Sequence, residues 1–255
     1  MLNRKPSRPV KIGNITIGGG HKIAVQSMCT KNTEDYAAVI DEIKKLTDAG
    51  CDIIRIGVLN EAAARVINKI KSAITIPLVA DIHFDYRLAL IAIEEGVEKL
   101  RLNPGNIKNK DHIEMVVSAA KKNKIPIRIG VNSGSAPREL LEKHGGRICA
   151  GLLVDSALWE IKLLESFDFR DIVISLKASS PSMTVDAYRK MSQLCDYPLH
   201  LGVTEAGVRA TGEIRSAIGI GALLYEGIGD TLRVSLTDDP VYEIAAAGKI
   251  INALN

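Results

Sequence analysis

Short apolar runs alternate with segments of helical periodicity along almost the whole chain. Eight runs are rich in β-branched residues and have the length of strands; they cover residues 22–28, 52–58, 76–83, 99–103, 125–132, 171–179, 198–205 and 231–237. Between them apolar residues recur every three or four positions, which predicts helices over 33–50, 60–73, 87–96, 112–124, 157–167, 184–195, 207–227 and 242–254.

Eight consecutive strand–helix units favour a closed (β/α)8 TIM barrel of the α/β class, because right-handed crossovers place each strand beside the previous one. The alternative is an open doubly wound sheet, whose first strand–helix turn normally carries a glycine fingerprint. The turn after Met28 has none, and the glycines at 18–20 precede the first strand. We expect residues 10–18 to form a short hairpin at the N-terminal end of the barrel. No linker interrupts the pattern, so residues 1–255 are expected to form a single TIM-barrel domain.

Composition narrows the class of protein. Of the 255 residues 46% are apolar, 25% are charged and 4% are aromatic, so the core must rest on Ile, Val, Leu and Ala. A net charge of +3 without a basic run argues against nucleic acid as a partner. No apolar run reaches the ~18 residues of a membrane span, and the first residues lack a signal-peptide core. We therefore expect a cytoplasmic protein without a membrane partner.

The cysteines and histidines show no metal-binding pattern. The four cysteines are widely spaced and form no CxxC pair, so the sequence predicts neither a disulfide framework nor a metal site. Cys29 follows the first strand near the expected mouth of the barrel. The thiols expected to fill small spaces in the core are Cys51, Cys149 and Cys195. The histidines interpreted as surface or packing residues are His21, His112, His144 and His200.

Polar side chains gather toward the C-terminal ends of the strands. In 99–103 and 125–132 the apolar residues share one face of the strand and the polar residues share the other. The apolar face must meet the helices, so the polar face must point into the barrel, at the end where barrel enzymes keep their active sites. The predicted lumen residues are Gln26, Arg55, Asp81, His83, Arg101, Asn103, Arg128, Asn132, Lys177, Glu205, Arg233 and Ser235.

This set is unbalanced in charge, because two carboxylates face five cations: Arg55, Arg101, Arg128, Lys177 and Arg233. Buried charge is costly unless it is paired. An anionic ligand is the natural complement, and arginine forks match phosphate oxygens. A single lumen arginine would more commonly belong to a structural ion-pair layer, and His83 alone is equally consistent with packing at a strand end. Several cations at one depth favour a diphosphate ligand instead.

Several strings together carry a family resemblance: VQSM (25–28), IIRIGV (53–58), ADIHFD (80–85), KLRLNPGN (99–106), RIGVNSGS (128–135), SLKAS (175–179), LGVTEAG (201–207) and the stretch 217–237. From about residue 8 to 255 the chain resembles 4-hydroxy-3-methylbut-2-enyl diphosphate synthase of the non-mevalonate isoprenoid pathway. This family reductively opens 2-C-methyl-D-erythritol 2,4-cyclodiphosphate and eliminates water to give the allylic diphosphate.

The resemblance implies a role for each lumen residue. Asp81 and His83 would lie beside the substrate, and Glu205 would be a candidate for proton transfer, so these three are the expected catalytic residues. The implied phosphate-binding residues are Arg55, Arg101, Asn103, Arg128, Asn132, Lys177, Arg233 and Ser235.

The resemblance also implies a redox cofactor and partners. Family members continue into a C-terminal domain in which three cysteines and one glutamate hold a [4Fe–4S] cluster. This sequence has no CxxC, so we expect those ligands to be absent from it and the isolated chain to be inactive in the reductive step. The implied partners are an external electron donor of the ferredoxin or flavodoxin type and a second copy in a head-to-tail homodimer.

Two other functions fit the sequence. One is a pterin- or phosphosugar-handling barrel related to dihydropteroate synthase, although Phe84 and Tyr86 are the only aromatic residues near the expected mouth. The other is a non-catalytic barrel that binds an anionic metabolite as a sensor or scaffold.

Overall fold

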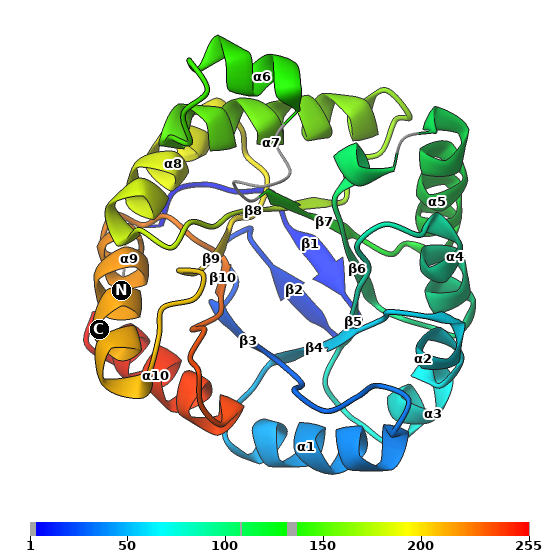
Figure 1. The fold of residues 1–255 in the computed structure, drawn as a ribbon. Coiled ribbons are helices and arrows are strands. Elements are labelled where there is room, and N and C mark those ends of the chain that lie inside the picture. Colours follow the sequence, from blue (N-terminus) through cyan, green and yellow to red (C-terminus); the bar gives the residue numbers. More distant parts are fainter. Residues whose placement is uncertain (1–3, 108, 132–136, 255) are drawn as a thin grey trace.

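The strands form a closed parallel barrel surrounded by helices (Figure 1). The computed structural model describes residues 4–107, 109–131 and 137–254. The hydrogen-bonded strand order is β8-β7-β6-β5-β4-β3-β10-β9, and a parallel bridge between Ile174 and Leu199 closes the ring between β8 and β9. The barrel strands are β3 (Ala24–Met28), β4 (Ile53–Gly57), β5 (Leu78–Asp81), β6 (Lys99–Leu102), β7 (Ile127–Val131), β8 (Ile172–Leu176), β9 (His200–Leu201) and β10 (Thr231–Leu232). The predicted (β/α)8 barrel is thus confirmed.

The helices pack around the outside of the ring, and several of them begin at side-chain caps that the sequence supplies. Asp35, Asn60 and Ser180 each accept a hydrogen bond from a backbone N–H of the first helical turn. The described helices are α1 (Tyr36–Asp48), α2 (Glu61–Arg65), α3 (Ile67–Ser72), α4 (Tyr86–Glu94), α5 (Lys110–Asn123), α6 (Arg138–Lys143), α7 (Ala150–Glu165), α8 (Pro181–Leu194), α9 (Arg209–Tyr225) and α10 (Pro240–Asn252), with a 3₁₀ turn at Pro104–Asn106.

Several element predictions were wrong in detail, including the strand expected over 231–237, which is hydrogen-bonded as a strand only at Thr231–Leu232. The helix expected over 60–73 is divided at Val66, and the one expected over 157–167 begins at residue 150. Helix α6 was not predicted. The strand expected over 198–205 is hydrogen-bonded as a strand only at residues 200–201, because the chain leaves the ladder before its apolar pattern ends.

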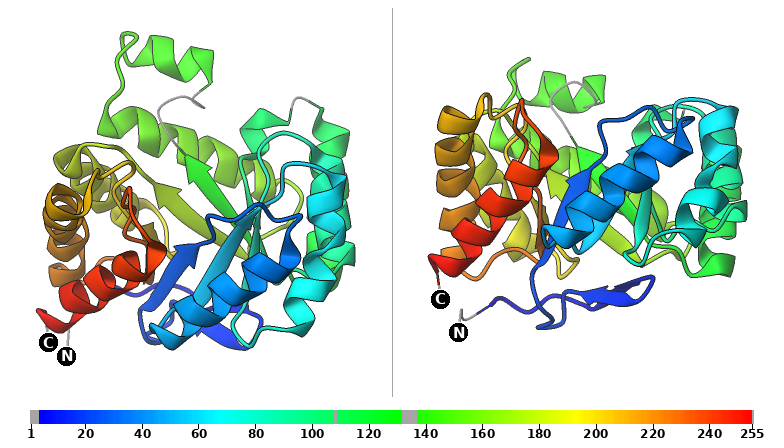
Figure 2. Two further views of the ribbon diagram at one scale, coloured as in Figure 1. Left: turned by 60° about the horizontal axis from the view of Figure 1, so that its bottom comes forward. Right: turned by 90° about the horizontal axis from the view of Figure 1, so that it is seen from below.

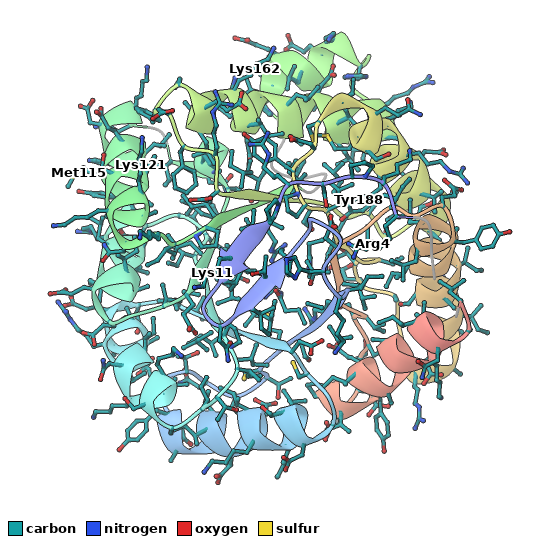
Figure 3. All side chains as sticks on the ribbon, turned by 180° about the vertical axis from the view of Figure 1, so that it is seen from behind. Arg4, Lys11, Met115, Lys121, Lys162 and Tyr188 are labelled. Atoms are coloured by element: carbon teal, nitrogen blue, oxygen red, sulfur yellow. The ribbon has the colours of Figure 1, made fainter. Side chains whose placement is uncertain are left out.

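An antiparallel hairpin closes the N-terminal end of the barrel, as predicted. Strands β1 (Val10–Ile12) and β2 (Ile15–Ile17) lie beneath the barrel (Figure 2), and Lys11 is seen over its centre when the molecule is viewed from that side (Figure 3). Apolar hairpin residues pack on the lowest layer of the lumen, which consists of Ala24, Ile53, Val79 and Val173. The apolar plug leaves the opposite end of the barrel for polar chemistry.

Across the described residues, no helix combines the length and apolarity needed to cross a membrane.

Candidate functional site

A cavity of about 180 Å³ opens at the C-terminal ends of the barrel strands. Most of the predicted site residues meet there. Those that line it are Arg55, Asp81, His83, Arg101, Arg128, Lys177, Arg233 and Ser235, together with Gly130, Val131, Ser175, Val203 and Thr204. Seven strands, or the residues that directly follow them, therefore bring side chains to one small volume, and strand periodicity predicted the residues from six of the seven.

Asp81 is the carboxylate that Arg55 and Arg101 share. Its Oδ1 accepts a hydrogen bond from Arg101 Nη1 at 3.1 Å, and its Oδ2 lies 3.6 Å from Arg55 Nε. His83 Nε2 lies 3.7 Å from the same Oδ2. Burial alone would raise the pKa of Asp81, but His83 and the two guanidinium groups outweigh it and hold the pKa well below its usual range. Asp81 is therefore ionised at neutral pH and has no proton to donate.

A second carboxylate, which strand periodicity did not reveal, comes from outside the barrel. Glu243 on α10 is buried, and its two oxygens each accept a hydrogen bond from Arg233 at 3.1 Å. Glu243 also accepts a bond from the Leu236 amide at 3.0 Å. This bidentate pair neutralises Arg233 and fixes the strand–helix loop behind it.

Arg128 and Lys177 have no carboxylate partner among the described residues. The Nε and Nη2 atoms of Arg128 are buried without a hydrogen-bond partner there. Burial, and then the neighbouring Arg128, Arg233 and Arg55 charges, lower the pKa of Lys177 well below its ordinary value. An uncompensated pair of cationic side chains in one cavity is the arrangement that an anionic ligand would relieve.

A further buried polar layer lies in the same strands, toward the hairpin. Lys99 is fully buried and donates a hydrogen bond to Gln26 Oε1 at 3.1 Å. His200, which had been interpreted as a surface or packing residue, is also fully buried, and burial lowers its pKa well below the ordinary value. The signal for Lys99 was available, because it lies two residues before Arg101 and so points to the same face.

Two glycines leave space in the barrel for the Arg101 and Lys177 side chains. A Cβ at Gly130 would lie 2.6 Å from Arg101 Nε, and a Cβ at Gly202 would lie 2.7 Å from Lys177 Nζ. Any side chain at either position would displace a charged group from the cavity. Glycine at these lumen positions is therefore part of the site.

Three predicted residues lie away from the cavity or outside the described chain. Asn103 is buried beside it and accepts a hydrogen bond from the Gly130 amide at 3.0 Å. Glu205 lies in the turn beyond β9 with a φ of 51°, is exposed, and is not among the lining residues. Asn132 falls outside the described residues.

The described chain offers no ligand set for a metal or an iron–sulfur cluster. No group of three or more His, Cys, Asp and Glu side chains converges within the described ranges. Cys29, expected near the mouth, is buried, and Cys51 is a core residue as expected. Cys195 is partly buried and packs against the core, whereas Cys149 is partly buried at the start of α7. These residues do not fit a [4Fe–4S] cluster.

Comparison with known proteins identifies the family. Residues 7–248 match the model described as "GcpE TIM-barrel domain". The 4-hydroxy-3-methylbut-2-en-1-yl diphosphate synthase (flavodoxin) of Fusobacterium nucleatum is 55% identical over 249 residues, which are 98% of this chain and 70% of that protein. The enzyme of the same name from Bacillus anthracis is 52% identical over 253 residues, which are 99% of this chain and 69% of that protein.

Solved structures show the same fold at low identity. Dihydropteroate synthase from Stenotrophomonas maltophilia superposes with a TM-score of 0.67 at 14% identity, covering 98% of this chain and 100% of that chain. The Yersinia pestis dihydropteroate synthase gives 0.66 at 11% identity, covering 96% and 98%. At such identities the likeness concerns the barrel alone. The match over residues 7–248 and the relatives at 52–55% identity place the chain in the GcpE family, that of the 4-hydroxy-3-methylbut-2-en-1-yl diphosphate synthases.

Proposed function

We propose that this barrel binds 2-C-methyl-D-erythritol 2,4-cyclodiphosphate for reductive ring opening and dehydration to the allylic diphosphate. The observation that carries the proposal is the pair Arg128 and Lys177, cationic side chains in the cavity without a carboxylate partner in the described chain. A diphosphate supplies the negative charge that these two groups lack. Its oxygens also suit the fork geometry of a guanidinium.

The other cations would orient the ligand. Arg55 and Arg101 are already held by Asp81, and Arg233 by Glu243, so their guanidinium groups present the remaining N–H donors in fixed directions. The neutral donors that we assign to the phosphate oxygens are Ser235, Asn103 and, outside the described residues, Asn132. Pre-positioned donors lower the entropy cost of binding.

We assign the protein's own proton chemistry to residues at the rim. Asp81 is ionised, so it would orient Arg55 and Arg101 and accept, rather than donate, hydrogen bonds. His83 lies at the cavity between Asp81 and Arg101 Nη1, which is 3.3 Å from its Nδ1, and could carry a proton to a leaving oxygen. Glu205 could act only if the exposed turn that bears it moves over the bound ligand.

We assign the electrons to an external donor of the ferredoxin or flavodoxin type, and flavodoxin appears in the names of the related enzymes. We also propose a homodimer. Because the cysteines present do not fit a [4Fe–4S] cluster, we expect this 255-residue chain by itself to bind the cyclic diphosphate, to show no cluster absorbance and not to reduce the ligand.

Isothermal titration calorimetry tests the proposal. The purified chain is titrated with the cyclic diphosphate and, as a control, with a pterin diphosphate of the kind that a dihydropteroate synthase would bind. We expect binding of the first ligand only, and loss of that binding in Arg128→Met. Preference for the pterin would instead support the second enzyme class, and binding of neither would support a scaffold.

A further inference from the structure

A cysteine, a histidine and an aspartate form a chain of contacts at the corner between α6 and α7. Cys149 Sγ lies 3.6 Å from His144 Nδ1, and His144 Nε2 lies 3.0 Å from Asp155 Oδ2. Lys143 Nζ lies 2.8 Å from the same carboxylate oxygen. In Figure 2 this corner lies on the side of the barrel opposite the N-terminal hairpin, and it is separate from the residues that line the phosphate cavity.

The contacts fix the direction of each hydrogen bond. The Lys143 hydrogen bond lowers the pKa of Asp155 and the His144 bond lowers it further, so this carboxylate is ionised and can only accept. His144 Nε2 must therefore carry the donated proton. In the neutral imidazole Nδ1 then has a free lone pair, and that lone pair faces the Cys149 thiol.

The position of Cys149 adds a second feature. It is the N-cap residue of α7, a helix of 16 residues whose first turn receives no side-chain cap. Negative charge at such a helix terminus is stabilised by the unpaired backbone N–H groups. Gly151 is required for the arrangement, because a Cβ there would lie 2.9 Å from His144 Cε1.

The other three thiols are in contrasting surroundings. Cys29 and Cys51 are buried, and burial raises the pKa of both. Burial also raises the pKa of Cys195, whose Sγ contacts the Met191 carbonyl oxygen at 3.8 Å. Only Cys149, among all four cysteines, contacts a basic side chain within a nucleophile–base–carboxylate chain.

We propose that Cys149 is an activated thiol and a site of reversible S-thiolation by small-molecule disulfides such as oxidised glutathione. The thiol proton passes to His144 Nδ1, and Asp155 stabilises the imidazolium. The Cys149 sulfur then attacks one sulfur of the disulfide, so that one S–S bond forms as another breaks. The departing thiolate takes the proton from the imidazolium, and the disulfide is the oxidant that the step consumes.

The first measurement is where oxidised glutathione reacts. The folded chain is incubated with it at pH 7.5, and the adduct is located by peptide mass spectrometry. We expect a single adduct, on Cys149, that is removed by a thiol reductant and is absent from Cys149→Ser. Adducts spread over several cysteines, an adduct elsewhere, or none would overturn the proposal.

The second measurement is the rate of reaction with an aromatic disulfide reagent as a function of pH. His144→Asn should slow the Cys149 phase by at least about tenfold at pH 7 and shift its pH profile to that of an ordinary thiol. Gly151→Ala should also slow it, because the added methyl group displaces the imidazole without removing any titratable group or disfavouring the helix. Cys195→Ser is the control and should leave the phase unchanged. An unaltered rate and profile in His144→Asn, with the circular dichroism of the parent, would contradict the mechanism.

Discussion

Replacing Lys177 by methionine should make the empty protein more stable and its diphosphate binding weaker. In the empty cavity the Lys177 side chain has no hydrogen bond to a described residue, and a Cβ at Gly202 would lie 2.7 Å from its Nζ, so the amine is packed against the backbone just beyond β9. Methionine has a similar length and fills the same space without the charge. The substitution therefore separates the destabilising effect of an amine placed among the lumen arginines from the contribution of that amine to ligand binding.

The expected sizes follow from the cost of burying charge and from the strength of charged hydrogen bonds. Removing this partly buried amine, which has no carboxylate partner among the described residues, should stabilise the fold by about 1–3 kcal/mol, which raises Tm by roughly 3–10 °C in a protein of this size. Losing one charge-assisted bond to a phosphate oxygen costs about 1.5–3 kcal/mol, or about a 10- to 150-fold increase in Kd.

Lys177 should also link binding to pH. Burial and the neighbouring arginines lower its pKa in the empty site, and a bound diphosphate should raise the pKa again. Protons are then taken up on binding over the pH range between the two values, and affinity falls as pH rises through that range.

Calorimetry in buffers of different ionisation enthalpy measures that proton uptake, and thermal unfolding measures the stability. The matched control is Lys162→Met, because Lys162 is exposed on α7 (Figure 3) and should change neither quantity. A Lys177→Met protein that is less stable than the parent, or that binds the diphosphate with unchanged affinity, would refute the reasoning.

Three other substitutions test parts of the account. Burial raises the pKa of Glu160 to about 8. The contribution of Glu160 to the free energy of unfolding should therefore be fully present below pH ~4.5, and up to about 5 kcal/mol of it should be lost as pH rises through about 8. In urea unfolding, Glu160→Gln should show a flatter dependence of this free energy on pH. Gly130→Ala should displace Arg101 and weaken diphosphate binding about tenfold, whereas Gly248→Ala, where a Cβ meets nothing within 4 Å, should not; equal affinities would count against the close contact. The Tyr188 hydroxyl accepts from the Leu176 amide at 2.9 Å and donates to the His200 carbonyl. Tyr188→Phe removes both hydrogen bonds, which bridge β8 and β9, and should therefore lower the free energy of unfolding by about 2 kcal/mol. An unchanged free energy of unfolding would show that the Tyr188 hydroxyl does not stabilise the fold.

Strand periodicity predicted most of the barrel strands and many of the side chains that line the cavity. Alternation of apolar and polar residues decided which side chains face the lumen, and Arg101 and Arg128 lie where it placed them, paired in register on neighbouring strands. The hairpin followed from its position before the first strand. These features depend on the local sequence pattern, so a single sequence is enough to predict them.

The missed features depend on contacts between distant elements. Glu243 reaches Arg233 from the last helix, and no strand periodicity indicates which helical residue turns inward. Glu205 follows strand-like sequence, yet the ladder ends at Leu201 and a left-handed turn carries its side chain outward. The Cys149–His144 contact depends on α6, a helix too short for its periodicity to be detected.

The most direct test of the central claim is the position of the ligand's phosphorus atoms in a crystal of the chain grown with the cyclic diphosphate. We expect phosphoryl oxygens within about 3 Å of the Arg128 and Lys177 side-chain nitrogens. Phosphate density elsewhere on the barrel, with both side chains still unpaired, would contradict it.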